Sequence, residues 1–126
     1  MSPRQLASLV AAGRIGFGAA LLAEPERFVV PWIGRDGAHA GPRVLGRALG
    51  ARDLVLGAGA ISASDDAVLT WLIAALAADA TDLLATLGAG SGVPLRGRVL
   101  VGVAAFGGLA LGVAAVAGLL GAPQRD

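Results

Sequence analysis

The stretch from Val99 to Gly121, VLVGVAAFGGLALGVAAVAGLLG, decides the fold class, because no ionisable residue occurs between Arg98 and Arg125. A helix needs roughly 20 apolar residues to cross a bilayer core about 30 Å thick. This stretch exceeds that length and consists of small and aliphatic residues with a single phenylalanine. It therefore predicts a transmembrane helix.

The rest of the chain is nearly as apolar. Hydrophobic residues make up 56% of the 126 positions, charged residues only 15%, and the mean hydropathy is +0.74, whereas soluble domains carry about 25% charge. We therefore expect an all-α protein, a single domain over residues 1–126. It should be an integral membrane four-helix bundle with helices at about residues 5–23, 44–63, 67–90 and 99–121. A soluble bundle, or a signal peptide interrupted by Arg14, is the weaker alternative.

Turn-forming residues separate the four stretches, at residues 34–37, 62–66 and 88–94. In the second turn Ser64, Asp65 or Asp66 is expected to cap the following helix. The segment 24–34 mixes aromatic and aliphatic residues with charges. We expect this segment to lie at the membrane interface, with Trp32 near the lipid headgroups.

Arginines in short loops predict the orientation, because such loops tend to stay in the cytoplasm. The loops after the first and third stretches carry five of them: Arg27, Arg35, Arg43, Arg96 and Arg98. The opposite side carries only Arg4 and Arg125. We expect a multi-pass protein of the inner (plasma) membrane, with both arginine-bearing loops in the cytoplasm and both termini outside.

The composition excludes several kinds of site. The chain has no cysteine for a disulfide or a thiolate metal site, and a net charge of +1 gives no basic surface for nucleic acid. His39, the only histidine, is expected to be a solvated loop residue. Asp79 and Asp82 are spaced like the metal-binding carboxylates of membrane prenyl transferases, but a second acidic motif is missing and nearby arginines compete for their oxygens. We expect no metal and no cofactor.

Six charges fall inside the predicted spans, three positive and three negative: Arg14, Arg47, Arg52, Asp53, Asp79 and Asp82. A charge at the bilayer centre costs about 2.5–3.5 kcal/mol on an insertion scale, so these side chains should face the bundle interior and pair. At a rise of 1.5 Å per residue, five of them lie about 12–16 Å from the cytoplasmic end, and Arg47 lies about 5 Å from it. We expect the six to form a neutral ionic layer.

Small residues should let the helices that carry these charges approach closely. One face of the second predicted helix bears Gly46, Gly50, Asp53 and Gly57. In the fourth, Gly108 and Gly112 form a small-xxx-small pair suited to packing in the bundle or to dimerisation.

The ionic layer has a structural and a functional interpretation. Structurally, it fixes the register of the helices without necessarily adding stability. Functionally, intramembrane ionisable groups mark ligand or proton sites, which makes all six residues candidates for ligand binding. Arg14 or Arg52 would hold the anionic or carbonyl head of a lipophilic molecule. Asp79, Asp82 and Asp53 are the candidate acid–base residues.

The residues from Arg47 to Gly57, RALGARDLVLG, followed by Trp71 and by ADATD at residues 78–82, resemble the DUF4267 family of small actinobacterial membrane proteins. Other residues follow the family's order in the first part of the chain: Arg14, Gly18, Leu21, Pro25 and Trp32. The similarity covers about residues 6 to 120. It implies a DoxX-like four-helix membrane fold but no activity. Some DoxX relatives are similar to subunits of quinone-linked oxidoreductases, which implies a partner or quinone-binding role in any redox function.

Three functions stay open at this point. The first is a non-enzymatic membrane subunit that binds a quinone or a lipid at the ionic layer, in a homodimer or a larger complex. The second is a membrane-embedded isomerase, cyclase or hydrolase of an isoprenoid-like substrate, with Asp79 and Asp82 as acid and base. The third is a dimeric proton-coupled transporter similar to the small multidrug-resistance proteins, although those carry a glutamate in the first helix, where this chain has Arg14.

Overall fold

The computed structural model describes residues 1–121, and every regular element in that range is helical. Seven elements follow one another: α1 (Pro3–Ala23), α2 (Pro25–Ile33), η1 (Arg35–Ala38), α3 (Ala40–Ser62), α4 (Asp65–Gly88), η2 (Gly90–Gly92) and α5 (Leu95–Gly121). The all-α prediction is confirmed. The helix count differs, because the segment 24–34, expected at the membrane interface, forms a short fifth α-helix, α2. The predicted spans agree in position with α1, α3, α4 and α5, while Arg125, used for the orientation, lies outside the described residues.

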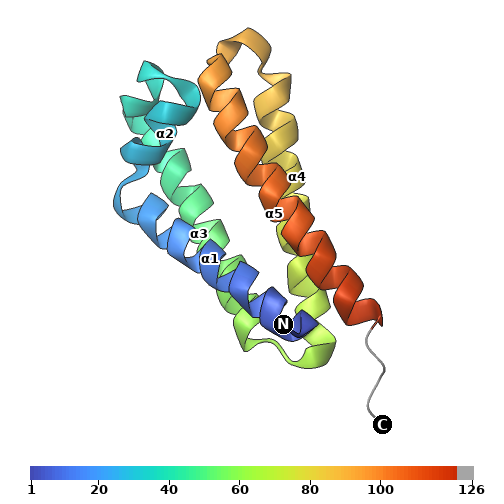
Figure 1. Cartoon of the computed structure of the whole chain (residues 1–126). Helices are drawn as coiled ribbons and strands as arrows, with labels where there is room; N and C mark the ends of the chain where they lie inside the picture. The colour runs from blue at the N-terminus through green and yellow to red at the C-terminus, as the bar shows by residue number, and fades with distance from the viewer. Residues whose placement is uncertain (122–126) are drawn as a thin grey trace.

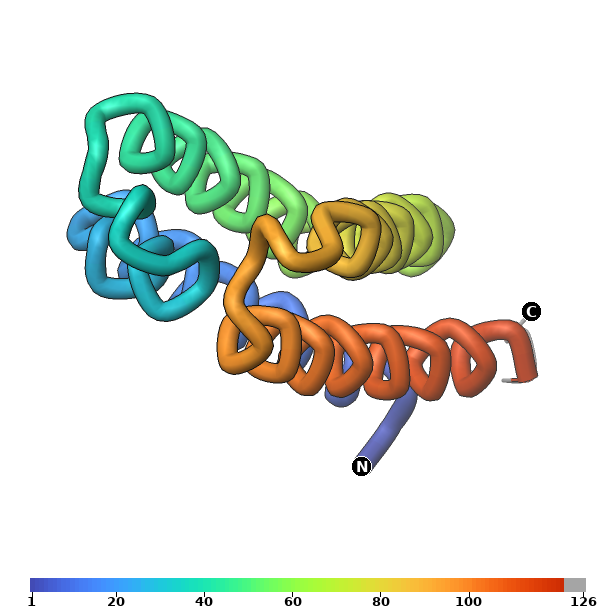
Figure 2. Tube along the Cα trace, turned by 90° about the horizontal axis from the view of Figure 1, so that it is seen from above, coloured from blue at the N-terminus to red at the C-terminus, as the bar shows by residue number. Residues whose placement is uncertain are grey.

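The four long helices form a ring in which each contacts two neighbours, in the order α1, α3, α4, α5. Contact is most extensive between α1 and α3 and next between α4 and α5. Figure 1 shows these two pairs meeting at the end that holds the N-terminus and diverging toward the end that holds α2. Figure 2 shows the ring from above, with α3 and α4 in one layer and α1 and α5 in the other.

Glycines permit the close contact between α1 and α3. A β-carbon on Gly18 would lie 2.6 Å from the backbone oxygen of Gly50, and one on Gly50 would lie 2.7 Å from the oxygen of Gly18. About two turns away on each helix, a β-carbon on Gly57 would lie 2.6 Å from the oxygen of Ala11. The predicted glycine face of residues 46–57 is thus buried against α1, with Asp53 in its middle.

Glycines also shape the contacts of α5. A β-carbon on Gly112 would lie 2.6 Å from the side chain of Leu76 on α4, and one on Gly108 would lie 2.8 Å from a carboxylate oxygen of Asp79. The pair predicted at these positions therefore packs inside the bundle. Near the start of α5, Gly97 lies directly against the backbone of Trp32 and so fixes α2 to the bundle.

The helix ends differ in part from the prediction. Ser2 forms a capping box with Gln5 at the start of α1, in which the Gln5 backbone N–H donates to Ser2 Oγ at 3.1 Å. Ser64 is the N-cap residue of α4, as predicted, but its side chain makes no capping hydrogen bond. Asp65 and Asp66 lie in the first turn of α4, where negative charge is favourable next to the helix dipole.

Large apolar side chains point outward more often than inward. The buried core cluster is small and joins α1, α4 and α5; its members are Ala7, Val68, Leu72 and Ala115. Many leucines, valines and phenylalanines of α1, α4 and α5 are exposed. Within residues 1–121, these same three helices are long and apolar enough to cross a membrane. α3 is not among them, since it carries Arg43, Arg47, Arg52 and Asp53.

Replacing Gly18 with Ala should lower the free energy of unfolding by about 1–3 kcal/mol, as overpacked sites do, because the new methyl group would meet the α3 backbone. Gly16→Ala is the matched control on the same helix, since nothing lies within 4 Å of that position. Unfolding in mixed micelles, followed by circular dichroism during a titration with sodium dodecyl sulfate, measures both variants. Equal stability of the two variants would contradict the assigned α1–α3 contact.

Candidate functional site

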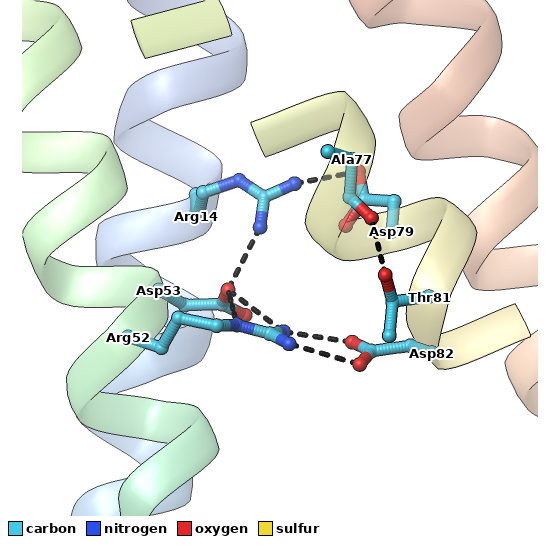
Figure 3. A network of polar contacts seen from close by, with 7 residues as sticks. All are labelled: Arg14, Arg52, Asp53, Ala77, Asp79, Thr81 and Asp82. Atoms are coloured by element: carbon cyan, nitrogen blue, oxygen red, sulfur yellow. Dashed lines mark hydrogen bonds and ion pairs between the residues drawn. The ribbon is translucent and has the colours of Figure 1, made fainter. Parts of the chain in front are cut away.

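Arg14 of α1 connects two carboxylates that come from different helices. One terminal nitrogen donates to Oδ1 of Asp53 on α3 at 2.7 Å, and the other donates to Oδ2 of Asp79 on α4 at 2.5 Å (Figure 3). Charge-assisted hydrogen bonds of this length are the strong ones in proteins. A single guanidinium therefore joins the α1–α3 pair to α4.

Arg52 makes a second connection between α3 and α4. Its two terminal nitrogens donate to the two carboxylate oxygens of Asp82, at 2.9 and 2.7 Å, in the parallel arrangement that a planar guanidinium favours. Its Nε and one terminal nitrogen also donate to Oδ1 of the neighbouring Asp53, at 3.4 and 3.2 Å. The five residues Arg14, Arg52, Asp53, Asp79 and Asp82 thus form one continuous network, called the polar network below (Figure 3).

The polar network is more buried on its Arg14 side than on its Arg52 side. The side chains of Asp53, Arg14 and Asp79 are 7%, 10% and 14% exposed, while those of Arg52 and Asp82 are 30% and 24% exposed. Two charges brought out of water offset their desolvation only when the geometry is good and further hydrogen bonds are made. Asp53 meets this condition, because both guanidiniums donate to it.

Arg47, the sixth predicted member, does not join the network. It lies nearer the α2 end of α3, where its Nε donates to the backbone oxygen of Leu22 at 3.3 Å. It lines a separate surface cavity with other charged side chains of that end: Glu24, Glu26, Arg27 and Arg43. The neutral layer of three against three is therefore wrong. The network holds two arginines and three aspartates, with a formal charge of −1.

A cavity of about 630 Å³ borders the polar network, and all five network residues line it. Its other walls are almost wholly apolar and come mainly from α1, α2 and α5, with Leu49 from α3; they include Leu9, Val10, Phe17, Phe28, Trp32, Leu100, Val101, Ala104 and Leu111. The most exposed apolar residues of these walls, Leu9, Phe17, Leu100 and Leu111, belong to α1 and α5. The cavity is thus an apolar space with one charged side, open between these two helices.

The sequence did not reveal the aromatic end of this cavity. Phe17 and Phe28 pack edge to face with ring centroids 5.5 Å apart, and Trp32 lines the same space. The amphipathic pattern of residues 24–34 was the sequence signal for it, but that pattern does not show which faces of α1 and α5 the segment lies against.

The hydroxyl of Thr86, on α4, is also buried and has no hydrogen-bond partner among the described residues.

Other candidate chemistry finds no support among residues 1–121. No group of three or more acidic, histidine or cysteine side chains there is arranged to hold a metal ion. His39 is exposed in the loop before α3, where its ring lies 3.0 Å from the backbone oxygen of Asp36. Comparison of the chain with family models, with curated proteins and with solved structures found no significant match. The resemblance to the DUF4267 family therefore stays a prediction.

Arg14→Gln should destabilise the protein strongly, by about 3–5 kcal/mol, because removal of one partner leaves buried carboxylates without their counter-charge. Arg47→Gln, the matched control, should change the free energy of unfolding by less than about 1 kcal/mol, since Arg47 makes one backbone contact outside the network. The same unfolding titration in mixed micelles gives both values. If Arg14→Gln proved as mild as Arg47→Gln, the polar network would not be holding the helix pairs together.

Proposed function

We propose that this protein is a non-enzymatic membrane subunit that binds a lipophilic molecule in the cavity beside the polar network. One observation carries the proposal: an apolar space of about 630 Å³ ends on five charged side chains. Ligand sites have this character, mostly apolar walls with a few polar groups that fix orientation. A quinone and a lipid are the candidate ligands, with the apolar part in the cavity and the polar end toward Arg14 and Arg52.

The mouth of the cavity supports a ligand that arrives from the bilayer. It lies between α1 and α5, two of the helices that are long and apolar enough to span, and its rim consists of exposed leucines and a phenylalanine. A ligand dissolved in lipid would enter sideways without crossing water. The outward-facing apolar side chains of the bundle favour the same membrane setting.

We further propose that α3 is a fourth span. Its charges at residues 52 and 53 pair with partners on α1 and α4, which removes the main cost of burying them. In this arrangement the loops near α2 and η2 lie on the cytoplasmic face of the inner membrane and both termini lie outside. The DUF4267 resemblance, with its DoxX-like fold, fits this topology, and assembly into a homodimer or larger complex is part of the proposal.

The enzyme and transporter hypotheses depend on the same carboxylates. Both oxygens of Asp82 accept hydrogen bonds from Arg52, and one oxygen each of Asp53 and Asp79 accepts from Arg14. Acid–base work at Asp82 would require one of those contacts to break, and a proton on Asp53 or Asp79 would weaken the ion pair with Arg14. We therefore place binding ahead of an isomerase, cyclase or hydrolase and ahead of proton-coupled transport.

Tryptophan fluorescence tests the binding proposal. The chain has two tryptophans, Trp32 and Trp71, and only Trp32 lines the cavity. In a Trp71→Phe variant, decylubiquinone or a lipid with brominated acyl chains should quench Trp32 in a saturable manner at low mole fraction. In Trp32→Phe, Trp71 should show only the shallow linear quenching of a bulk membrane quencher. Equal, linear quenching in both variants would contradict the proposal.

A cavity-filling variant provides the second arm. Ala104 lines the cavity, so Ala104→Phe should abolish the saturable component of quenching. Ala110 lies on the same helix, is exposed and does not line the cavity, which makes Ala110→Phe the matched control. Saturable quenching that survives Ala104→Phe and Ala110→Phe equally would place the binding site elsewhere.

A further inference from the structure

We infer that the cavity selects a lipophilic cation, an amphiphile whose polar end carries one positive charge. This inference rests on the proposed binding function and, among lipophilic ligands, favours a cationic amphiphile over the quinone and the anionic lipid. The starting point is the charge of the polar network, in which Arg14 and Arg52 face three carboxylates. In a medium of low dielectric constant, an uncompensated unit charge raises the free energy of the protein, and a bound ligand of opposite charge lowers it again.

No other charge near the cavity cancels the excess within the described residues. The network draws its charges from α1, α3 and α4, and the part of α5 that lines the cavity, residues 100–111, contains no ionisable side chain. α2 contributes Arg27 at the rim, but Arg27 is exposed and paired with Glu24 at 3.0 Å. The residues lining the cavity therefore leave one negative charge open to a ligand.

The hydrogen-bonding capacity of the network points the same way. All three guanidinium nitrogens of Arg52 and both terminal nitrogens of Arg14 already donate to carboxylates. Oδ2 of Asp53 and Oδ1 of Asp79 accept no hydrogen bond from the described residues, although Asp53 is more than nine-tenths buried. A cationic head meets these free acceptor oxygens. An anionic head could still reach the three unused N–H groups of Arg14, but it would bring a further negative charge to a network that already carries one in excess.

The aromatic end of the cavity adds a second attraction for a cation. Phe17, Phe28 and Trp32 line the space that the network borders. Aromatic faces attract cations, and clusters of them recognise quaternary ammonium groups. The apolar walls on α1 and α5 would receive the rest of the ligand. A quaternary or protonated amine, or a phosphonium, on an apolar body matches all three features better than a neutral quinone or an anionic lipid.

Two ions of nearly equal size and opposite charge, tetraphenylphosphonium and tetraphenylborate, test this inference. Each is titrated by calorimetry into the wild-type protein in nanodiscs of zwitterionic lipid, with empty nanodiscs subtracted to remove partition into lipid. We expect saturable one-to-one binding of the phosphonium, tighter than that of the borate by on the order of tenfold or more. Equal or tighter binding of the borate would overturn the inference and show that a proton, or a rearranged arginine, balances the network.

Substitutions that keep the shape of the network should shift this preference stepwise. Asp79→Asn brings the formal charge to zero and should remove the preference between the two ions. The double variant Asp53→Asn and Asp79→Asn brings it to +1 and should favour the borate. Asp65→Asn, at the exposed start of α4, is the control and should leave the wild-type preference intact. If these folded variants bind the two ions with the same preference as the wild type, although the formal charge of the network has changed, the inference is contradicted.

The two proposals fail in different ways. If both ions bind with equal affinity and Ala104→Phe abolishes both, the cavity binds lipophilic molecules but the charge selection is wrong. If neither ion binds more than it binds to empty nanodiscs, and the quenching of Trp32 fluorescence is also linear, the cavity is not a ligand site. If neither ion binds while Trp32 shows saturable quenching by decylubiquinone, the binding function stands and the cationic ligand class is excluded.

Discussion

The guanidinium of Arg14 is the contact on which the rest of the structure depends. It lies on α1, yet its two terminal nitrogens reach carboxylates on α3 and on α4. The contact between α1 and α3 is already close through glycines, so its bond to Asp53 adds specificity to a pair that packs in any case. Its bond to Asp79 is different, because it joins the second helix pair to the first (Figure 3).

The cavity lies beside close helix contacts that small residues permit. Glycines 18, 50 and 57 bring the α1 and α3 backbones into contact, and Gly112 of α5 makes room for the Leu76 side chain of α4. Between α1 and α5, large and small residues together line a space on one side of the polar network. The bundle thus combines tight contacts that fix the charged groups with one loose contact that leaves room for a molecule beside them.

Much of this arrangement could be predicted from the sequence. The helical class, the positions of the four long helices and the buried glycine face of α3 agree with the structure, because apolar length and helical periodicity determine them. The grouping of residues 14, 52, 53, 79 and 82 followed from depth along antiparallel helices. Whether these charges lie within a bilayer is still a prediction.

Other features required the three-dimensional structure. Arg47 was placed in the ionic layer although its depth already set it apart, and its real contact is the end of α1. This one residue changes the charge of the network from zero to −1 and with it the class of ligand expected. The cavity and its aromatic end were also missed, since they depend on how α2 turns back over α1 and α5, which no pattern within a single helix encodes.

A high-resolution structure of the protein extracted together with its native lipid tests the central claim most directly, because it shows what fills the space between α1 and α5. We predict elongated density that lies between α1 and α5, passes Phe17 and ends at Asp79, with Arg14 still bound to both of its carboxylates. The contrary result is direct packing of α1 side chains on α5 side chains with no space beside the polar network. In that case the five charged residues would serve only to hold the helices in register.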